Sequence, residues 1–92
     1  MKTIIIACGA GVATSTVITS YVTQLLRDNN IEHRIIQCSL SEVRMHIDKG
    51  DLLVTSMPLK EKYDIPTVLG ISFLTGVEVS KTMEDIVSYL GN

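Results

Sequence analysis

The sequence is poor in the residues on which several large classes of protein depend. It has no Trp and a single Phe, Phe73, so it lacks the aromatic side chains on which nucleic-acid bases stack. Its 10 acidic residues outnumber the 8 Lys and Arg, the net charge is −2, and the basic residues form no cluster. We therefore expect no nucleic-acid partner. No apolar run approaches the length of a membrane span, and the first residues lead directly into a strand pattern too short for a signal peptide.

Cysteine and histidine are also scarce. Cys8 and Cys38 do not form a C-x-x-C pair, and their spacing suggests neither a disulfide framework nor a zinc site. His33 and His46 are isolated, so we interpret them as ordinary structural or surface residues and expect no metal and no cofactor. This cysteine usage is typical of a reducing, cytoplasmic location. We interpret Cys38 as a packing residue, whereas Cys8 belongs to the motif described below.

Strand and helix patterns alternate along the chain. Its 92 residues, 46% of them hydrophobic, suffice for one small domain, which we predict to span residues 1–92. Alternating units with apolar strands predict an α/β fold: a single doubly wound, four-stranded parallel sheet of order 2-1-3-4 with helices on both faces, Rossmann-like or low-mass tyrosine-phosphatase-like. The predicted strands are 3–8, 33–38, 52–55 and 67–71. The predicted helices are 14–29, 80–90 and, between them, a helix that begins with the capping box Ser39–Glu42 and stops at Lys49–Gly50. A loop is predicted at 56–66 and a turn at Thr75–Gly76.

The stretch from Cys8 to Thr16 lies between the first strand and the first helix. Its small residues allow successive backbone N–H groups to point inward as an anion nest, and the helix N-terminus adds further donors. A thiol held there is favoured as the thiolate, because the same field that binds phosphate stabilises negative charge. A lone Cys at a strand end is often only a small core residue, and a Gly-rich turn often only connects two elements. The hydroxyls of Thr14, Ser15 and Thr16, directly behind the glycines, favour an anion site.

Four familiar chemistries fit this stretch poorly. A dinucleotide fingerprint needs a small residue where Thr14 stands and an acidic residue where the second strand ends in Cys38. A P-loop needs a Lys, and a thioredoxin-like enzyme needs a second Cys close by, but neither is present. A cysteine phosphatase would place an Arg at position 14 to clamp the phosphoryl group. A Cys nucleophile that can accept and shield a phosphoryl group, without evident means to hydrolyse it, is what remains.

The sequence resembles the IIB component of the sugar phosphotransferase system, and within it the galactitol-type group. The similarity covers essentially the whole chain, and the cysteine loop is its most specific part. The residues that carry it are Ala7–Gly9, Val12–Thr16, Ile36–Cys38 with Glu42, Asp51–Leu52, Val54–Thr55, Asp64–Pro66 and Phe73–Val77.

The resemblance implies a cytoplasmic phosphoryl carrier. In this family a phosphohistidine on a IIA protein donates its phosphoryl group to the cysteine, here Cys8, which passes it to a sugar or polyol bound by the membrane-embedded IIC permease. The enzyme class would be a phosphotransferase that works through a phosphocysteine, at the inner face of the membrane. The residues expected to surround the phosphoryl group are Gly9, Ala10, Gly11, Val12, Ala13, Thr14 and Ser15.

The loop at 56–64 is expected to lie beside Cys8, because it follows the neighbouring strand of the predicted sheet. Lys60, Lys62 and Tyr63 are therefore predicted to take part in partner docking, although such lysines are often only solvated loop charges. We expect the chain to be a monomer. A low-mass phosphatase or reductase-like enzyme and a phosphate-binding module, in which Cys8 is incidental, remain as alternatives.

Overall fold

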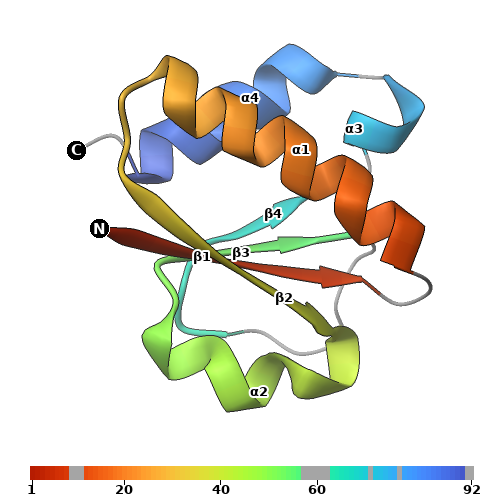
Figure 1. Cartoon of the computed structure of the whole chain (residues 1–92), viewed down its shortest axis with the longest axis vertical. Helices are drawn as coiled ribbons and strands as arrows, with labels where there is room; N and C mark the ends of the chain where they lie inside the picture. The colour runs from red at the N-terminus through yellow and green to blue at the C-terminus, as the bar shows by residue number, and fades with distance from the viewer. Residues whose placement is uncertain (9–11, 57–62, 71, 77, 91–92) are drawn as a thin grey trace.

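A single four-stranded parallel sheet forms the centre of the protein (Figure 1). The computed structural model describes residues 1–8, 12–56, 63–70, 72–76 and 78–90, with Cys8, Val12–Ser15, Leu40 and Leu74 described by their backbone only. The strand order, β2-β1-β3-β4, is the order that the sequence predicts, and all three strand pairs are parallel. The strands are β1 Lys2–Cys8, β2 His33–Ser39, β3 Leu52–Thr55 and β4 Thr67–Leu69.

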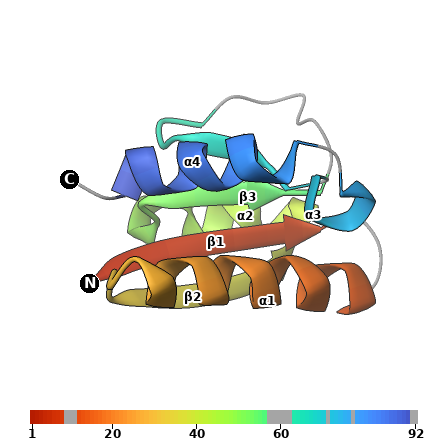
Figure 2. The ribbon, with the colours of Figure 1, turned by 90° about the horizontal axis from the view of Figure 1, so that it is seen from above.

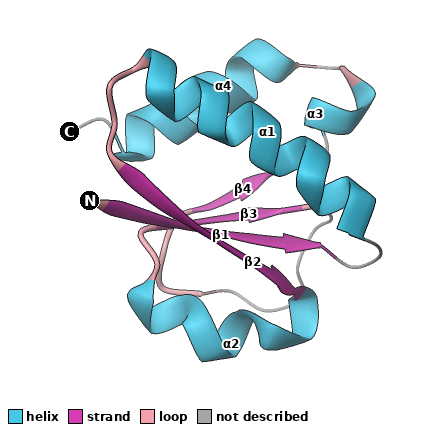
Figure 3. Ribbon diagram, in the orientation of Figure 1, coloured by secondary structure: helices cyan, strands magenta, loops and turns pink. Residues whose placement is uncertain are grey.

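Helices cover both faces of the sheet (Figure 3). The long helix α1, Val12–Asp28, lies on one face with α3, Ser72–Thr75, and α4, Val79–Leu90, as the view from above also shows (Figure 2). The other face carries one segment, in which a four-residue α2, Val43–His46, stands between the 3-10 turns Leu40–Glu42 and Ile47–Lys49. The predicted doubly wound α/β fold is confirmed.

The alternation of side chains along the central strands divides the core in two. Ile4 and Ile6 belong to a large cluster under α1 and α4, whereas Ile5 and Ala7 belong to a smaller cluster under α2. All four are fully buried, because in a parallel sheet with helices on both faces every residue of a central strand meets a covered surface. The apolar run that predicts β1 is therefore continuous rather than alternating.

Helix α1 ends at Asp28, one residue before its predicted end, and Asn30 closes it. Asn30 adopts a left-handed conformation, with φ of 56°. The Asn30 N–H donates to the Arg27 carbonyl at 3.1 Å, and the Ile31 N–H donates to the Leu26 carbonyl at 2.9 Å. These two bonds are those of a Schellman motif, which satisfies the last free carbonyls of the helix.

The predicted start of the first helix is wrong by two residues. The helix begins at Val12 rather than at residue 14, so Val12 and Ala13 lie in its first turn and not in a loop. Ala is the best helix former, so Ala13 fits the first turn of a helix. The N–H groups of a first turn have no partner within the helix, so no earlier residues are needed to accept their hydrogen bonds. Consequently Thr14, Ser15 and Thr16 lie inside the helix, and none of them is its N-cap.

The region after β3 departs most from the prediction. Strand β4 ends at Leu69 rather than at residue 71, and the one-turn helix α3 follows where the sequence predicts only a turn. The ring of Phe73, buried on α3, stacks on Tyr21 of α1 with ring centroids 5.1 Å apart. This contact between distant segments favours the extra helical turn. The predicted turn is present at its end, where Gly76 has φ of 79°.

The predicted second helix is interrupted by 3-10 turns. Val43 is buried in the smaller cluster and Ile47 packs against it. Val43 is the one fully buried residue of the four-residue α2, so a longer regular helix would bury little additional apolar surface. The segment therefore bends to keep these contacts while its charged residues stay in solvent.

Gly70 directly follows β4 at a position that leaves no room for a side chain. A Cβ at this position would lie 2.8 Å from Cγ1 of Val54 and 3.4 Å from Cγ2 of Ile18. Both neighbours are buried and β-branched, so neither can move away easily. We expect Gly70→Ala to lower the free energy of unfolding by about 1–3 kcal/mol, measured by urea denaturation. Thr67→Ala, an exposed change three residues before Gly70, is the control and should have a small effect; equal stability of both variants would contradict the tight packing.

Candidate functional site

The carboxyl ends of the four strands form one edge of the molecule. Cys8 ends β1 and is level with Ser39, the last residue of β2. Ala7 pairs with Thr55 at the end of β3, and Thr55 pairs with Leu69 at the end of β4. In an open parallel sheet, ligands bind at this edge, at the topological switch point where the strand order reverses. That point lies between β1 and β3, so Cys8 lies at the expected position.

The N-terminus of α1 lies at this same edge (Figure 1). The first four N–H groups of a helix have no partner within it, and the aligned peptide dipoles make this end positive. The first turn of α1 contains no Asp or Glu that would neutralise it. Cys8 and the first turn of α1 are therefore brought together at one edge, which can stabilise a negatively charged group.

The structure describes the predicted phosphate-binding residues in part. Val12, Ala13, Thr14 and Ser15 form the first turn of α1. Gly9, Ala10 and Gly11 lie outside the described residues, as do the predicted docking residues Lys60 and Lys62. The roles predicted for these residues stay predictions.

Tyr63, the third predicted docking residue, is half-buried and packs against the cluster under α2. Cys38 belongs to the same surroundings, pairs with Ala7 across the sheet, and forms no disulfide bond. The packing role predicted for Cys38 agrees with this position. For Tyr63 the structure adds a structural role to the predicted docking role.

Three polar residues at the strand ends, Ser39, Thr55 and Ser56, were not predicted as site residues from the sequence. Thr55 and Ser56 are both buried at the edge, and the Ser56 N–H donates to the Ala7 carbonyl at 3.2 Å, one residue before Cys8. Ser39, level with Cys8, is exposed. The signal that could have found them is a hydroxyl residue directly after each apolar strand run, since parallel strands bring these positions together.

Ser39 and Glu42 form a small hydrogen-bonded group next to the end of β1. The Ser39 N–H donates to Oε1 of Glu42 at 3.0 Å, and the Ser39 hydroxyl donates to the same oxygen at 2.9 Å. The first of these is the acidic half of the predicted capping box. The Ser39 N–H, the Ser39 hydroxyl and the charge of His46 hold the pKa of the Glu42 carboxyl below its ordinary value. Glu42 is therefore a bound carboxylate near the cysteine at neutral pH.

This lowered pKa links Glu42 to the stability of the fold. A carboxyl whose folded pKa is below its unfolded value stabilises the protein above the unfolded pKa, and this stabilisation is lost as pH falls through the folded pKa. Glu42→Gln keeps an oxygen acceptor but removes the charge. We expect the variant to unfold at lower urea concentration than the parent at about pH 7, and the difference to shrink toward pH 3. A difference that is the same at both pH values would contradict a role for the charge.

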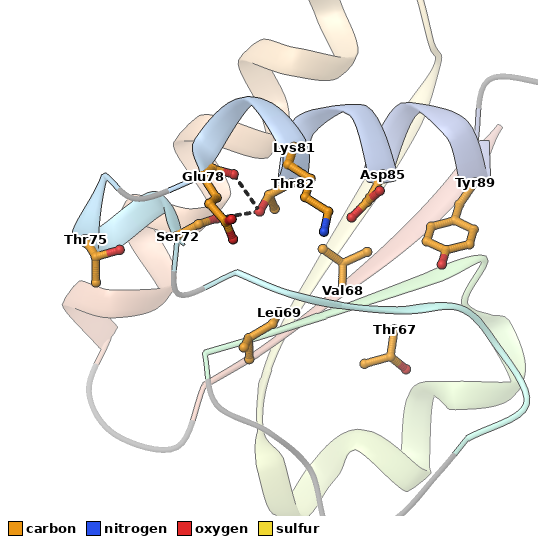
Figure 4. A pocket seen from close by; sticks show the side chains of 10 residues that line it. All are labelled: Thr67, Val68, Leu69, Ser72, Thr75, Glu78, Lys81, Thr82, Asp85 and Tyr89. Carbon is orange, nitrogen blue, oxygen red and sulfur yellow. Dashed lines mark hydrogen bonds between the residues drawn. The ribbon is translucent and has the colours of Figure 1, made fainter.

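The groove between β4 and α4 is a separate feature (Figure 4). It has a volume of about 410 Å³, and Lys81 and Tyr89 point into it from α4. The Ser72 hydroxyl donates to Oγ1 of Thr82 at 2.7 Å, and Thr82 donates to the Glu78 carbonyl at 3.3 Å, so its buried hydroxyls have partners. Among the residues whose side chains the structure describes, the groove is lined by none of the predicted site residues.

Metal and membrane chemistry can be checked for the described part of the chain. Within it, no three His, Cys, Asp or Glu side chains lie close enough together to hold a metal ion. The helices of the same ranges include none that is long and apolar enough to cross a bilayer.

One family of known proteins matches most of the chain. Residues 3–86 match the family described as "PTS system, Lactose/Cellobiose specific IIB subunit". The chain belongs to this IIB family of the phosphotransferase system. The IIB protein is a sugar-transport phosphotransferase component that carries a phosphoryl group, and its family implies a IIA protein and a IIC permease as partners.

Individual relatives cover nearly the whole IIB protein. It is 37% identical over 90 residues to an Escherichia coli K12 protein named as a phosphotransferase enzyme IIB component, SgcB, with 98% of each chain covered. It is 32% identical to the galactitol-specific IIB component of the same strain and 33% identical to that of Escherichia coli O157:H7, each over 97% of this chain and 96% of the relative.

Proposed function

We propose that Cys8 is the phosphoryl acceptor of this IIB protein. It receives the group from a phosphohistidine of the IIA partner and passes it to a sugar alcohol of the galactitol class, bound by the IIC permease. The observation that supports this role best is the position of Cys8: it ends β1 at the carboxyl edge of the sheet, and the N-terminus of α1 lies at the same edge. Cys38, in contrast, packs against a core cluster.

The chemistry needs little beyond placement and charge stabilisation. In the first step the Cys8 thiolate supplies the electron pair for a new P–S bond, and the P–N bond breaks with its electrons left on the histidine. In the second step an oxygen of the sugar alcohol forms a P–O bond, its proton is lost, and the thiolate leaves. In both steps the transferred group spreads negative charge over its equatorial oxygens, which fixed N–H donors stabilise. The first turn of α1, Val12 to Ser15, and the preceding residues Gly9 to Gly11 supply these donors.

The substrate class rests on the relatives. Two of them are named as galactitol-specific components, and they align with nearly all of this chain. The sugar alcohol itself is held by the permease, so this chain needs to recognise the permease and the phosphoryl group rather than the whole substrate. We propose that the chain acts at the inner face of the cell membrane. We also propose that it is a monomer, and sedimentation or light scattering can check this oligomeric state.

One experiment tests the central proposal. The purified chain is incubated with the phosphorylated IIA partner, and its intact mass is measured, followed by peptide mapping. We expect the mass of one phosphoryl group, located on Cys8 and released by iodine. A phosphoryl group on another residue, or none, would overturn the proposal. Continuous release of inorganic phosphate would point instead to the phosphatase alternative.

The lysines of the segment before Tyr63 are proposed to speed the encounter with the IIA partner. The approaching phosphohistidine protein brings negative charge, and lysines at the rim of an interface raise the association rate in a salt-dependent way. We expect the double change of Lys60 and Lys62 to Glu to slow transfer from IIA several-fold, with a weaker dependence on salt than in the parent. Quench-flow transfer at two salt concentrations measures both effects. An unchanged rate and salt slope would place the docking surface elsewhere; alkylation of Cys8 by iodoacetamide, as a control, should not change.

A further inference from the structure

Two long segments of the sequence contain no charged residue. Residues 3–26 have no Asp, Glu, Lys or Arg, and neither do residues 65–77. The first segment includes most of β1 and α1, and the second includes β4 and α3. Helices α1 and α3 lie side by side at the carboxyl edge of the sheet, where Tyr21 stacks on Phe73 (Figure 2). The fold therefore brings the two uncharged segments together next to the end of β1.

Their exposed residues make one surface, which we call the neutral face. Val17 is 40% exposed and Tyr21 is 41% exposed. Leu69, which is 40% exposed, ends β4 in the second uncharged segment at the same edge of the sheet. The neutral face consists of Thr16, Val17, Ser20 and Tyr21 of α1 with Thr75 and Gly76 at the end of α3.

Tyr21 gives the neutral face a rigid centre. Its ring lies at 10° to the ring of Phe73, which is only 4% exposed and therefore held by the core. An aromatic side chain that is already ordered loses little conformational entropy when a partner covers it. Exposure to solvent does not by itself explain the lack of charge on this face, because exposed positions on α2 and α4 do carry charged residues: Arg44, Lys81 and Glu84.

We propose that the neutral face docks the membrane-embedded IIC permease; this inference rests on the proposed function. The second phosphoryl transfer takes place on a substrate held in the membrane protein, so this edge must reach the level of the lipid headgroups. Cytoplasmic loops of membrane proteins carry an excess of Lys and Arg, and the headgroups nearby carry negative charge. A charged side chain buried in that contact without a partner would be costly whichever its sign. A neutral surface with an apolar centre and hydroxyl groups around it avoids this cost.

The test separates the two halves of the reaction. Ser20→Lys adds a charge to the neutral face at an exposed position of α1, and Ser88→Lys makes the same change at an exposed position of α4, outside the neutral face. The first half is the rate at which the phosphorylated IIA partner labels the chain in solution. The second half is the rate at which the labelled chain loses its phosphoryl group to substrate in vesicles that contain the IIC partner. Circular dichroism and thermal unfolding verify that both variants fold.

We expect Ser20→Lys to slow the second half about tenfold or more and to change the first half less than about twofold. Ser88→Lys should leave both halves near the parent rates. If Ser20→Lys slows both halves equally, or slows neither, the assignment of this face to the permease is wrong. An equal effect of Ser88→Lys would also overturn it. A parent chain that takes up no phosphoryl group in the first half would overturn the proposed function, a distinct outcome.

Discussion

Cys8→Ser is expected to abolish phosphoryl acceptance while the protein stays folded. A serine hydroxyl is not ionised at neutral pH and no general base is proposed beside it, whereas a thiol at a helix N-terminus is favoured as the thiolate. Uptake from the phosphorylated IIA partner should fall on the order of a thousandfold or more. Intact mass after timed incubation measures the uptake, and far-ultraviolet circular dichroism verifies the fold.

Cys38→Ser is the matched control, because it makes the same chemical change in the other cysteine. Cys38 is half-buried against the cluster under α2, so we expect a small loss of stability and nearly full phosphoryl uptake. Iodoacetamide should also modify Cys8 faster than Cys38 in the folded parent near neutral pH. A folded Cys38→Ser protein that takes up no phosphoryl group would show that the two roles are assigned wrongly.

A negative charge in the first turn of α1 is expected to raise the stability of the fold and to lower phosphoryl uptake. Thr14 is the third residue of the helix, and its first turn contains no acidic side chain. Thr14→Asp should raise the free energy of unfolding by about 0.3–1 kcal/mol, because a carboxylate at this end interacts favourably with the helix dipole. The same carboxylate would repel the incoming phosphoryl group and compete for its N–H donors. Uptake from the IIA partner should therefore fall about a hundredfold.

Thr14→Asn controls for the shape of the new side chain, since it matches Asp in size without the charge. We expect its uptake to lie much closer to that of the parent, and urea denaturation should show less stabilisation than for Asp. A Thr14→Asp variant that accepts the phosphoryl group at the parent rate would mean that the anion does not approach the first turn of α1. Equal loss in both variants would assign the effect to the threonine side chain rather than to charge.

Much of the fold follows from local patterns in the sequence. The apolar runs around Ile4–Ile6 and Leu52–Val54 determine two central strands, because only a sheet covered on both faces buries such a run completely. Asn30 determines the end of α1, since Asn tolerates the left-handed conformation that closes the helix. Right-handed connections then leave few orders for four parallel strands, and the observed order is the predicted one.

The position of the candidate site at this edge can also be predicted from the sequence. Cys8 directly follows an apolar strand and precedes a helical pattern, so its position at the carboxyl edge needs only the rule that parallel strands share this edge. The short polar sequence Ser39 to Glu42 predicts the carboxylate contact that the structure shows, because both partners are three residues apart.

Contacts between distant segments decided the remainder. The extra turn α3 depends on Phe73 packing against Tyr21, and the need for glycine at position 70 depends on Val54 and Ile18. Neither can be read from a local pattern, because each depends on which surfaces the folded chain brings within contact distance. The sequence by itself determined the sheet, its order and the place of Cys8, since these follow from hydrophobic periodicity and chain connectivity. Only the tertiary structure decided that two uncharged segments meet beside that edge, because the packing of α1 against α3 is set by side chains far apart in the chain.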